Sequence, residues 1–215
     1  GDRDREPGFA FDQGCDRMSV AVVKLGVGNT ASVMFALERL GVAAVLTDDP
    51  ARIGEAERVI LPGVGAAAHA MRLLRAKALG AVLRSFARPL LGICLGQQLL
   101  FESSEEGDAE GLGLISGRVK RFAASAETPT PHMGWSKLRP VRDNPLCEGV
   151  GAQDYTYFVH SYICPISDAT IATAEYGTAF PAMVARGNIF GCQFHPERSG
   201  AVGARILRNF LSLPC

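Results

Sequence analysis

The stretch that most constrains the fold of this chain is residues 90–102, in which a cysteine lies between two glycines. The stretch opens with an apolar run, which is typical of a strand buried on both faces of a parallel sheet. Gly92 and Gly96 lie two residues before and after Cys94. This spacing predicts a sharp turn from the strand into a helix that continues to Glu102. The turn would hold the thiol at the helix N-terminus, where free N–H groups and the helix dipole favour the thiolate.

The first half of the chain alternates between predicted strands and predicted helices. We expect strands over 19–25, 42–47, 57–61 and 90–94, and helices over 29–40, 66–79 and 81–87. This alternation predicts a parallel, doubly wound sheet. The glycine turn at residues 62–65 follows a strand, and open α/β sheets place their ligand sites at the carboxyl ends of strands.

The second half has a different pattern. Residues 112–194 read as short strands interrupted by Gly, Pro and Asn, which predicts a smaller mixed or antiparallel sheet. Gly187-Asn188 is a hairpin signal between two apolar runs. Residues 201–211 predict a closing helix with one apolar face.

Composition bounds the class of protein. The chain has 215 residues, 47% of them hydrophobic, and we expect a single α/β domain over 18–215. Residues 1–17 lack periodicity and are interpreted as a disordered extension or an expression leftover. Equal numbers of basic and acidic residues, 22 each, argue against nucleic acid or an anionic membrane as the main partner.

The cysteines and histidines of the chain indicate its cellular compartment and argue against a bound metal. The six cysteines contain no C-x-x-C pair, which favours free thiols in a reducing cytoplasm. The four histidines and six cysteines show no metal-ligand spacing, so we expect neither a metal nor a cofactor. No apolar run approaches the roughly 18 residues that a membrane span requires.

A second motif supplies a partner for the thiol. Pro196 holds His195 in the extended region, so the side chains of His195 and Glu197 are expected to face the same way. A carboxylate beside an imidazole fixes its tautomer and stabilises the imidazolium. A lone cysteine or a lone His-Pro-Glu turn is more often structural, but together the two motifs predict a Cys94–His195–Glu197 triad.

These motifs carry a family resemblance. The chain resembles the class I glutamine amidotransferases in residues 61–65, 92–102 and 194–197, and more narrowly their glutaminase subunits of imidazole glycerol phosphate synthase in residues 26–29, 131–135, 157–162 and 198–200. The resemblance covers the chain from about Met18 onward. It implies a flavodoxin-like class I glutamine amidotransferase fold, with a central, mostly parallel sheet flanked by helices.

The resemblance also implies an activity and its residues. Cys94 would attack L-glutamine and release ammonia, with His195 and Glu197 as the other catalytic residues. The backbone N–H groups of Val64 and Leu95 would form the oxyanion hole. The residues that would contact glutamine are Gly63, Gln98, Glu102, Ser161 and Tyr162. The enzyme would be a hydrolase alone, and a lyase as the complete synthase.

Ammonia must reach a second active site without becoming ammonium, so the resemblance implies a partner. That partner is a (β/α)8-barrel cyclase, bound as a heterodimer in the cytoplasm for histidine biosynthesis. The suspected interface residues are His132, Met133, Trp135 and Arg198. The chain departs from the family pattern at Lys24-Leu25, where Asp-Tyr is usual, at Gln97, where Met is common, and at Arg198, where Lys is common.

Three alternatives remain open at this point. The chain could be the glutaminase subunit of another class I amidotransferase, although residues 132–135 argue against this. It could be a cysteine peptidase or esterase on a flavodoxin-like fold, although Gln98 and Glu102 argue against that. It could also be a catalytically silent binding subunit, which an intact triad disfavours.

Overall fold

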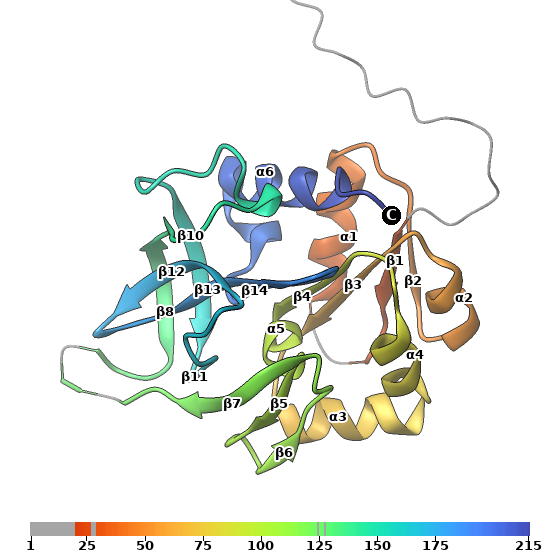
Figure 1. Cartoon of the computed structure of the whole chain (residues 1–215), viewed down its shortest axis with the longest axis horizontal. Coiled ribbons are helices and arrows are strands. Elements are labelled where there is room, and N and C mark those ends of the chain that lie inside the picture. The colour runs from red at the N-terminus through yellow and green to blue at the C-terminus, as the bar shows by residue number, and fades with distance from the viewer. Residues whose placement is uncertain (1–19, 27–28, 124, 127) are drawn as a thin grey trace, which may run out of the picture.

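An eight-stranded sheet runs through the middle of the molecule (Figure 1). The computed structural model describes residues 20–26, 29–123, 125–126 and 128–215. The expected N-terminal extension, and residues 27–28 of the segment 26–29 that carries part of the family resemblance, therefore lie outside the described residues. In spatial order the strands are β2 (Ala44–Thr47), β1 (Val20–Val23), β3 (Arg58–Gly63), β4 (Leu90–Cys94), β14 (Ile189–Cys192), β13 (Thr178–Arg186), β12 (Thr170–Tyr176) and β9 (Arg139–Pro140).

Neighbouring strands pair in parallel from β2 to β14. From β14 through β13 and β12 to β9 they pair antiparallel. The predicted parallel arrangement of the first half is therefore confirmed. The predicted hairpin at Gly187-Asn188 is also confirmed, since it joins β13 to β14. One correction concerns the second half: β9, β12, β13 and β14 extend the main sheet, with β14 paired in parallel to β4, so these four strands do not belong to a separate smaller sheet.

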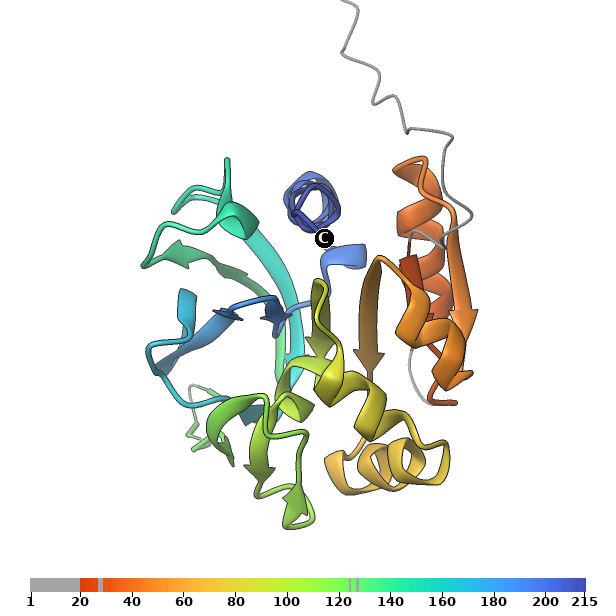
Figure 2. The same ribbon diagram turned by 45° about the vertical axis from the view of Figure 1, so that its right-hand side comes forward.

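Helices cover both faces of the sheet. On one face lie α1 (Thr30–Arg39) and α6 (Gly200–Leu211), and on the other lie α2 (Pro50–Glu55), α3 (Ala67–Ala76), α4 (Leu79–Ser85) and α5 (Leu95–Leu99). Figure 2 shows α6, in blue, and α3, in yellow, on opposite sides. The strands alternate between two cores: Val20 and Val22 pack beneath α1, whereas Ala21 and Val23 pack toward α2 and α3.

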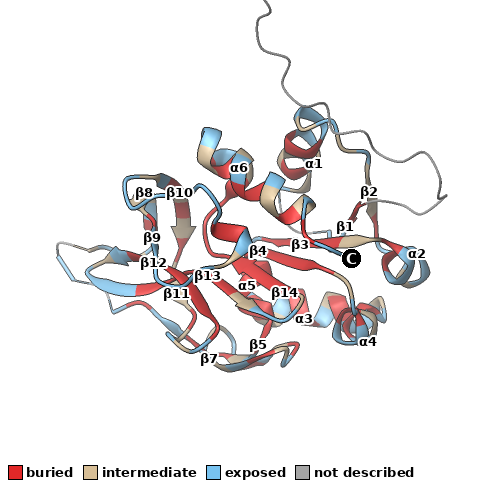
Figure 3. Cartoon of the chain, turned by 45° about the horizontal axis from the view of Figure 1, so that its top comes forward, coloured by how far each residue is buried: buried red, intermediate tan, exposed pale blue. Residues whose placement is uncertain are grey.

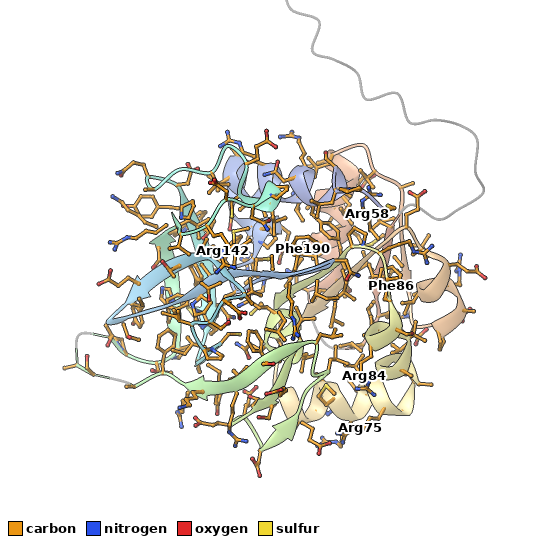
Figure 4. All side chains as sticks on the ribbon, in the orientation of Figure 1. Arg58, Arg75, Arg84, Phe86, Arg142 and Phe190 are labelled. Carbon is orange, nitrogen blue, oxygen red and sulfur yellow. The ribbon has the colours of Figure 1, made fainter. Side chains whose placement is uncertain are left out.

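The central strands are buried on both faces, as Figure 3 shows by their red colour. This burial explains why residues 90–94 lack polar side chains. Figure 4 places Phe190 of β14 near the middle of the molecule, where its ring lies 6.4 Å from that of Phe210 on α6. Arg75 and Arg84 lie toward the periphery in the same view.

Two smaller sheets lie beside the large one. Strands β8 (His132–Lys137) and β10 (Tyr155–His160) form an antiparallel pair. A mixed sheet contains β11 (Tyr162–Ile163), β7 (Ile115–Arg121), β5 (Phe101–Ser104) and β6 (Ala109–Glu110). Two single-turn 3-10 helices complete the elements, η1 (Pro145–Cys147) and η2 (Pro196–Arg198). The predicted mixed or antiparallel character of this part is confirmed.

The helix after Cys94 is shorter than predicted. It ends at Leu99, and Glu102 lies on β5. The carbonyl groups of Leu99 and Leu100 accept hydrogen bonds from Leu112 and Leu114, at 2.8 Å each, in place of the next helical turn. Long-range backbone pairing therefore overrides a local sequence that favours a helix.

The close approach of α5 to β3 generates a prediction about Gly96. A Cβ atom on Gly96 would lie 1.8 Å from the carbonyl oxygen of Leu61, so Gly96→Ala should lower the free energy of unfolding by about 3 kcal/mol or more. Gly54→Ala is the matched control, because the new Cβ would meet only Val82, at 3.8 Å. That control should be neutral or stabilise α2 by up to about 1 kcal/mol. Urea unfolding measures both, and equal stabilities would contradict the proposed steric limit.

Candidate active site

Cys94 occupies a strained backbone position at the junction of β4 and α5. Its φ is 55° and its ψ is −110°, a region that non-glycine residues rarely adopt. Its parallel register partner on β3 is Gly63, so the thiol lies beside the glycine turn that follows β3. The predicted turn is therefore confirmed, and Cys94 is only 6% exposed.

The flanking glycines permit this turn by close packing. A Cβ atom on Gly92 would lie 2.5 Å from the carbonyl oxygen of Gly96, and one on Gly96 would overlap the backbone of Leu61. Both glycines are described by the structure, and neither has a positive φ. Both positions therefore require glycine because the neighbouring backbone leaves no room for a Cβ atom, and not because of the backbone angle.

The His195 and Glu197 side chains form a buried pair. The Nδ1 atom of His195 lies 2.8 Å from Oε1 of Glu197, and the two side chains are 7% and 1% exposed. The expected contact is present, but its backbone basis differs from the prediction. Glu197 lies in the 3-10 helix η2, which begins at Pro196, so the two residues do not form an extended segment. Ser199 fixes the turn by donating its hydroxyl to the carbonyl oxygen of His195 at 2.7 Å.

Electrostatics favour the charged form of His195. Burial lowers the pKa of the imidazole, but its electrostatic interactions with Cys94 and Glu197 outweigh burial and raise the pKa to about 10. The Nε2 atom of His195 has no hydrogen-bond partner within the described part of the protein. With Nδ1 occupied by Glu197, Nε2 is the nitrogen left to exchange a proton with the thiol or with a substrate.

A cavity of about 550 Å³ opens at Cys94. It is lined by both Cys94 and His195, and by five residues that the sequence analysis selected: Val64, Leu95, Gln98, Ser161 and Tyr162. It is also lined by Gly65, Ala66, Glu106, Pro131, Val159 and His160. The predicted residues from the turn after β3, from α5 and from the start of β11 with the residue before it therefore converge on one space. Gly63 is absent from this lining, although it neighbours Cys94 in the sheet.

Glu102 lies outside this cavity. Its side chain is exposed on β5, and its Oε2 atom accepts the backbone N–H of Gly117 at 2.9 Å. The carboxylate that lines the cavity belongs to Glu106, which the sequence patterns did not indicate. Its Oε2 atom accepts the N–H of Ala67 at 2.8 Å, at the first residue of α3. Four carboxylates follow one another over residues 102–108, and no local pattern distinguishes the one that faces the cavity.

The predicted interface residues divide into two groups. Met133 and Trp135 are 64% and 55% exposed, but His132, which directly precedes Met133 in β8, is only 2% exposed. Neighbouring residues of a strand point to opposite faces, so the placement of His132 at the surface was wrong. Arg198 is exposed, and its guanidinium lies 5.2 Å from the centre of the Tyr157 ring.

His132 belongs to a buried aromatic cluster. Its ring stacks on those of Tyr176 and Phe158, with centroids 4.2 and 5.1 Å away. Its Nδ1 atom lies 3.3 Å from Nε2 of His160. Burial lowers the pKa of His132 to about 4 and that of His160 to about 3, so both histidines are neutral at pH 7.

The described residues contain no group of three or more His, Cys, Asp or Glu side chains placed to hold a metal ion. None of the described helices combines the length and apolar character needed to cross a membrane.

Comparisons with known proteins agree with this fold and site. A family model described as Glutamine amidotransferase class-I matches residues 22–213. The imidazole glycerol phosphate synthase subunit HisH of Xanthomonas axonopodis pv. citri is 52% identical over 90% of this chain and 97% of its own length. The HisH subunit of Idiomarina loihiensis is 50% identical over 91% of this chain and 98% of its own length.

Solved structures show the same fold at lower identity. A crystal structure of a glutamine amidotransferase aligns with a TM-score of 0.69 and 23% identity, covering 89% of this chain and 96% of that one. PurLQS from Thermotoga maritima aligns with a TM-score of 0.67 and 22% identity, covering 91% of this chain and 98% of that one.

The fold, the thiol site and the family match define a class I glutamine amidotransferase. Within that class, the chain belongs to the family of the imidazole glycerol phosphate synthase subunit HisH.

The buried histidines predict a loss of stability in acid. Unfolded histidines take up protons below about pH 6.5, whereas folded His132 stays neutral until about pH 4. The unfolded state therefore binds more protons in this window, and the free energy of unfolding should fall as the pH falls. His132→Phe, which keeps an aromatic ring in the cluster, should flatten this dependence. Urea unfolding between pH 7 and pH 4.5 measures it, with His69→Gln, at an exposed histidine of α3, as the control.

Proposed function

We propose that Cys94, His195 and Glu197 carry out the glutaminase reaction of this chain, which is the HisH-type subunit of imidazole glycerol phosphate synthase. The reaction hydrolyses L-glutamine to L-glutamate and ammonia. The observation that carries the assignment of residues is the buried His195–Glu197 pair, which shares one cavity with a thiol on a strained turn.

The raised pKa of His195 favours transfer of the thiol proton to the imidazole. The thiolate then attacks the carboxamide carbon and forms a tetrahedral oxyanion. His195 donates its proton to the departing nitrogen, which releases ammonia and leaves a thioester on Cys94. His195 next removes a proton from water, which attacks the thioester and releases glutamate. Glu197 holds Nδ1 of the ring throughout.

The oxyanion requires two N–H donors. Leu95 is the first residue of α5, so its N–H has no partner within the helix. Val64 lies directly after Gly63, the register partner of Cys94, and lines the cavity. Loss of one such donor typically costs about 2.7–4 kcal/mol in the barrier. Gly65 has a φ of 92°, which turns the chain sharply after Val64.

The zwitterionic end of glutamine needs a carboxylate and several polar contacts. Glu106 is the one carboxylate among the described residues that line the cavity, so it is assigned to the α-ammonium group. Gln98, Ser161 and Tyr162 line the same space and are assigned to the remaining contacts. The earlier assignment of Glu102 receives no support from the cavity, because its side chain is bonded to Gly117 outside it.

The ammonia is passed to a cyclase subunit, as the resemblance implies. The proposed interface is the outward face of β8 and β10, formed by Met133, Trp135, Tyr155 and Tyr157, together with Arg198. Trp135 and Tyr157 lie 5.8 Å apart between ring centres, and three of these side chains are prominently exposed apolar groups. Aromatic and arginine side chains of this kind are enriched at protein interfaces. The proposed compartment is the cytoplasm, where free thiols such as Cys94 stay reduced.

The test of the proposal separates the two half-reactions. Cys94→Ser should abolish glutamine-dependent synthesis by the complex, because the hydroxyl is a much weaker nucleophile in this site. Synthesis from added ammonia should continue at the wild-type rate, since it bypasses the thiol. The measurement is product formation by the reconstituted complex with each nitrogen source. Equal loss of both rates would overturn the glutaminase assignment of Cys94.

The choice of carboxylate gives a separate prediction. Glu106→Gln should raise the KM for glutamine at least about tenfold, since a charge-assisted contact to the ammonium is lost. Glu102→Gln should raise it less, because that side chain lies outside the cavity. Steady-state glutaminase assays with both variants decide the point. A larger effect at Glu102 would restore the original prediction and exclude Glu106.

A further inference from the structure

A buried amide contacts the nucleophile and has no part in the mechanism described so far. Gln193 is 0% exposed, and its Nε2 atom lies 3.8 Å from the sulfur of Cys94. Its Oε1 atom accepts a hydrogen bond from Nε2 of Gln98 at 3.0 Å. Gln193 directly precedes residues 194–197 of the family motif.

The neighbours of this amide determine which end faces the thiol. The carbonyl oxygen of Tyr162 can only accept hydrogen bonds, and it accepts one from Nε2 of Gln98 at 3.0 Å. The amide nitrogen of Gln98 therefore faces both Tyr162 and Gln193, and it uses one N–H on each. Oxygen is then the atom that Gln193 presents to Gln98, and nitrogen is the atom that it presents to Cys94.

The same carbonyl fixes two histidines. His160 places Nδ1 at 2.9 Å from the oxygen of Tyr162, so this nitrogen carries the proton and Nε2 is the acceptor. His132 then donates from Nδ1 to Nε2 of His160 at 3.3 Å. The remaining Nε2 atom of His132 accepts from the hydroxyl of Ser136 at 3.1 Å.

These contacts form one connected chain from Ser136, through His132, His160, the Tyr162 carbonyl and Gln98, to Gln193, and it is called the buried chain because its two imidazoles and two amides are buried. The low pKa values of both histidines keep them neutral, so each presents one donor and one acceptor. A protonated imidazole would present two donors and break the order of the chain at that link. Every donor in the chain therefore has a defined direction.

We propose that Gln193 is a catalytic hydrogen-bond donor to the sulfur of Cys94, and that the buried chain positions its amide for this role. This inference rests on the proposed function of Cys94. Sulfur is a weak acceptor as a thiol and a much stronger one as a thiolate. An N–H group at this position stabilises the thiolate relative to the thiol and adds to the charge attraction from His195. A glutamate at position 193 would instead place a like charge beside the thiolate.

The test is the pH dependence of Cys94 alkylation by iodoacetamide in the full chain. Mass spectrometry of the Cys94 peptide separates this thiol from the others. Gln193→Met removes the donor at nearly constant volume, and Gln193→Asn keeps the amide but draws it away from the sulfur. Both variants should move the pH midpoint of alkylation upward by about one unit, which corresponds to the loss of one hydrogen bond to a charged group. Below the wild-type midpoint, the rate should fall about tenfold.

The matched control is Gln97→Met, which makes the same chemical change at the glutamine directly before Gln98 on α5. Gln97 is also 0% exposed, but its amide contacts Cys164 and the carbonyl of Pro181, so it does not bond to Cys94. Its alkylation midpoint should match that of the wild type. Wild-type midpoints in a folded Gln193 variant, or an equal shift in Gln97→Met, would overturn the inference.

This readout needs no glutamine turnover, so it is separable from the proposed function. If Cys94→Ser retained glutamine-dependent synthesis, the mechanism would fail whatever the alkylation result. If Cys94→Ser lost that synthesis while the Gln193 variants kept the wild-type midpoint, the mechanism would stand and only the role of Gln193 would be excluded.

Discussion

The site depends on how closely α5 approaches the strands beneath it. Gly92 and Gly96 allow backbone to lie against backbone, and a side chain at either position would overlap its neighbours. This approach forces Cys94 into its strained conformation and places the first N–H of α5 beside the turn after β3. The nucleophile and both proposed oxyanion donors therefore have their relative positions fixed by packing in the main sheet.

Sequence patterns predicted the parallel sheet, the turn at Cys94 and the His195–Glu197 contact, because each follows from local periodicity or from glycine spacing. The patterns failed where long-range pairing decides the outcome. Glu102 was expected on a helix facing the substrate, but pairing of β5 with β7 ends that helix and turns its carboxylate toward Gly117. The carboxylate at the cavity is Glu106, whose position depends on how the loop closes onto α3. His132 is buried for a simpler reason, because successive residues of β8 face opposite sides and Met133 and Trp135 take the outer side.

The site combines two opposite electrostatic environments within a short distance. The charge of His195 is stabilised, since a carboxylate and a thiol face its two sides. The charges of His132 and His160 are suppressed, since both rings are buried among aromatic side chains, and for His160 this burial outweighs the opposite effect of its hydrogen bond to the Tyr162 carbonyl. Burial lowers the pKa of all three imidazoles. The presence or absence of a partner that favours the charged ring decides whether the net shift of the pKa is upward or downward. The same residue type thus serves as a proton carrier in one place and as a fixed hydrogen-bond link in the other.

Strand β8 has a surface side and an inner side, and the two sides should tolerate different replacements. Met133 and Trp135 face outward, whereas His132 and Ser136 face the interior and bond to each other past Gly134, which has no side chain. An outward residue can change together with the surface of another protein without disturbing the hydrogen bonds beneath it. An inward residue has no such freedom, because each replacement must preserve both a donor and an acceptor. Divergence along this strand should therefore follow a two-residue period, with drift on one side and near invariance on the other.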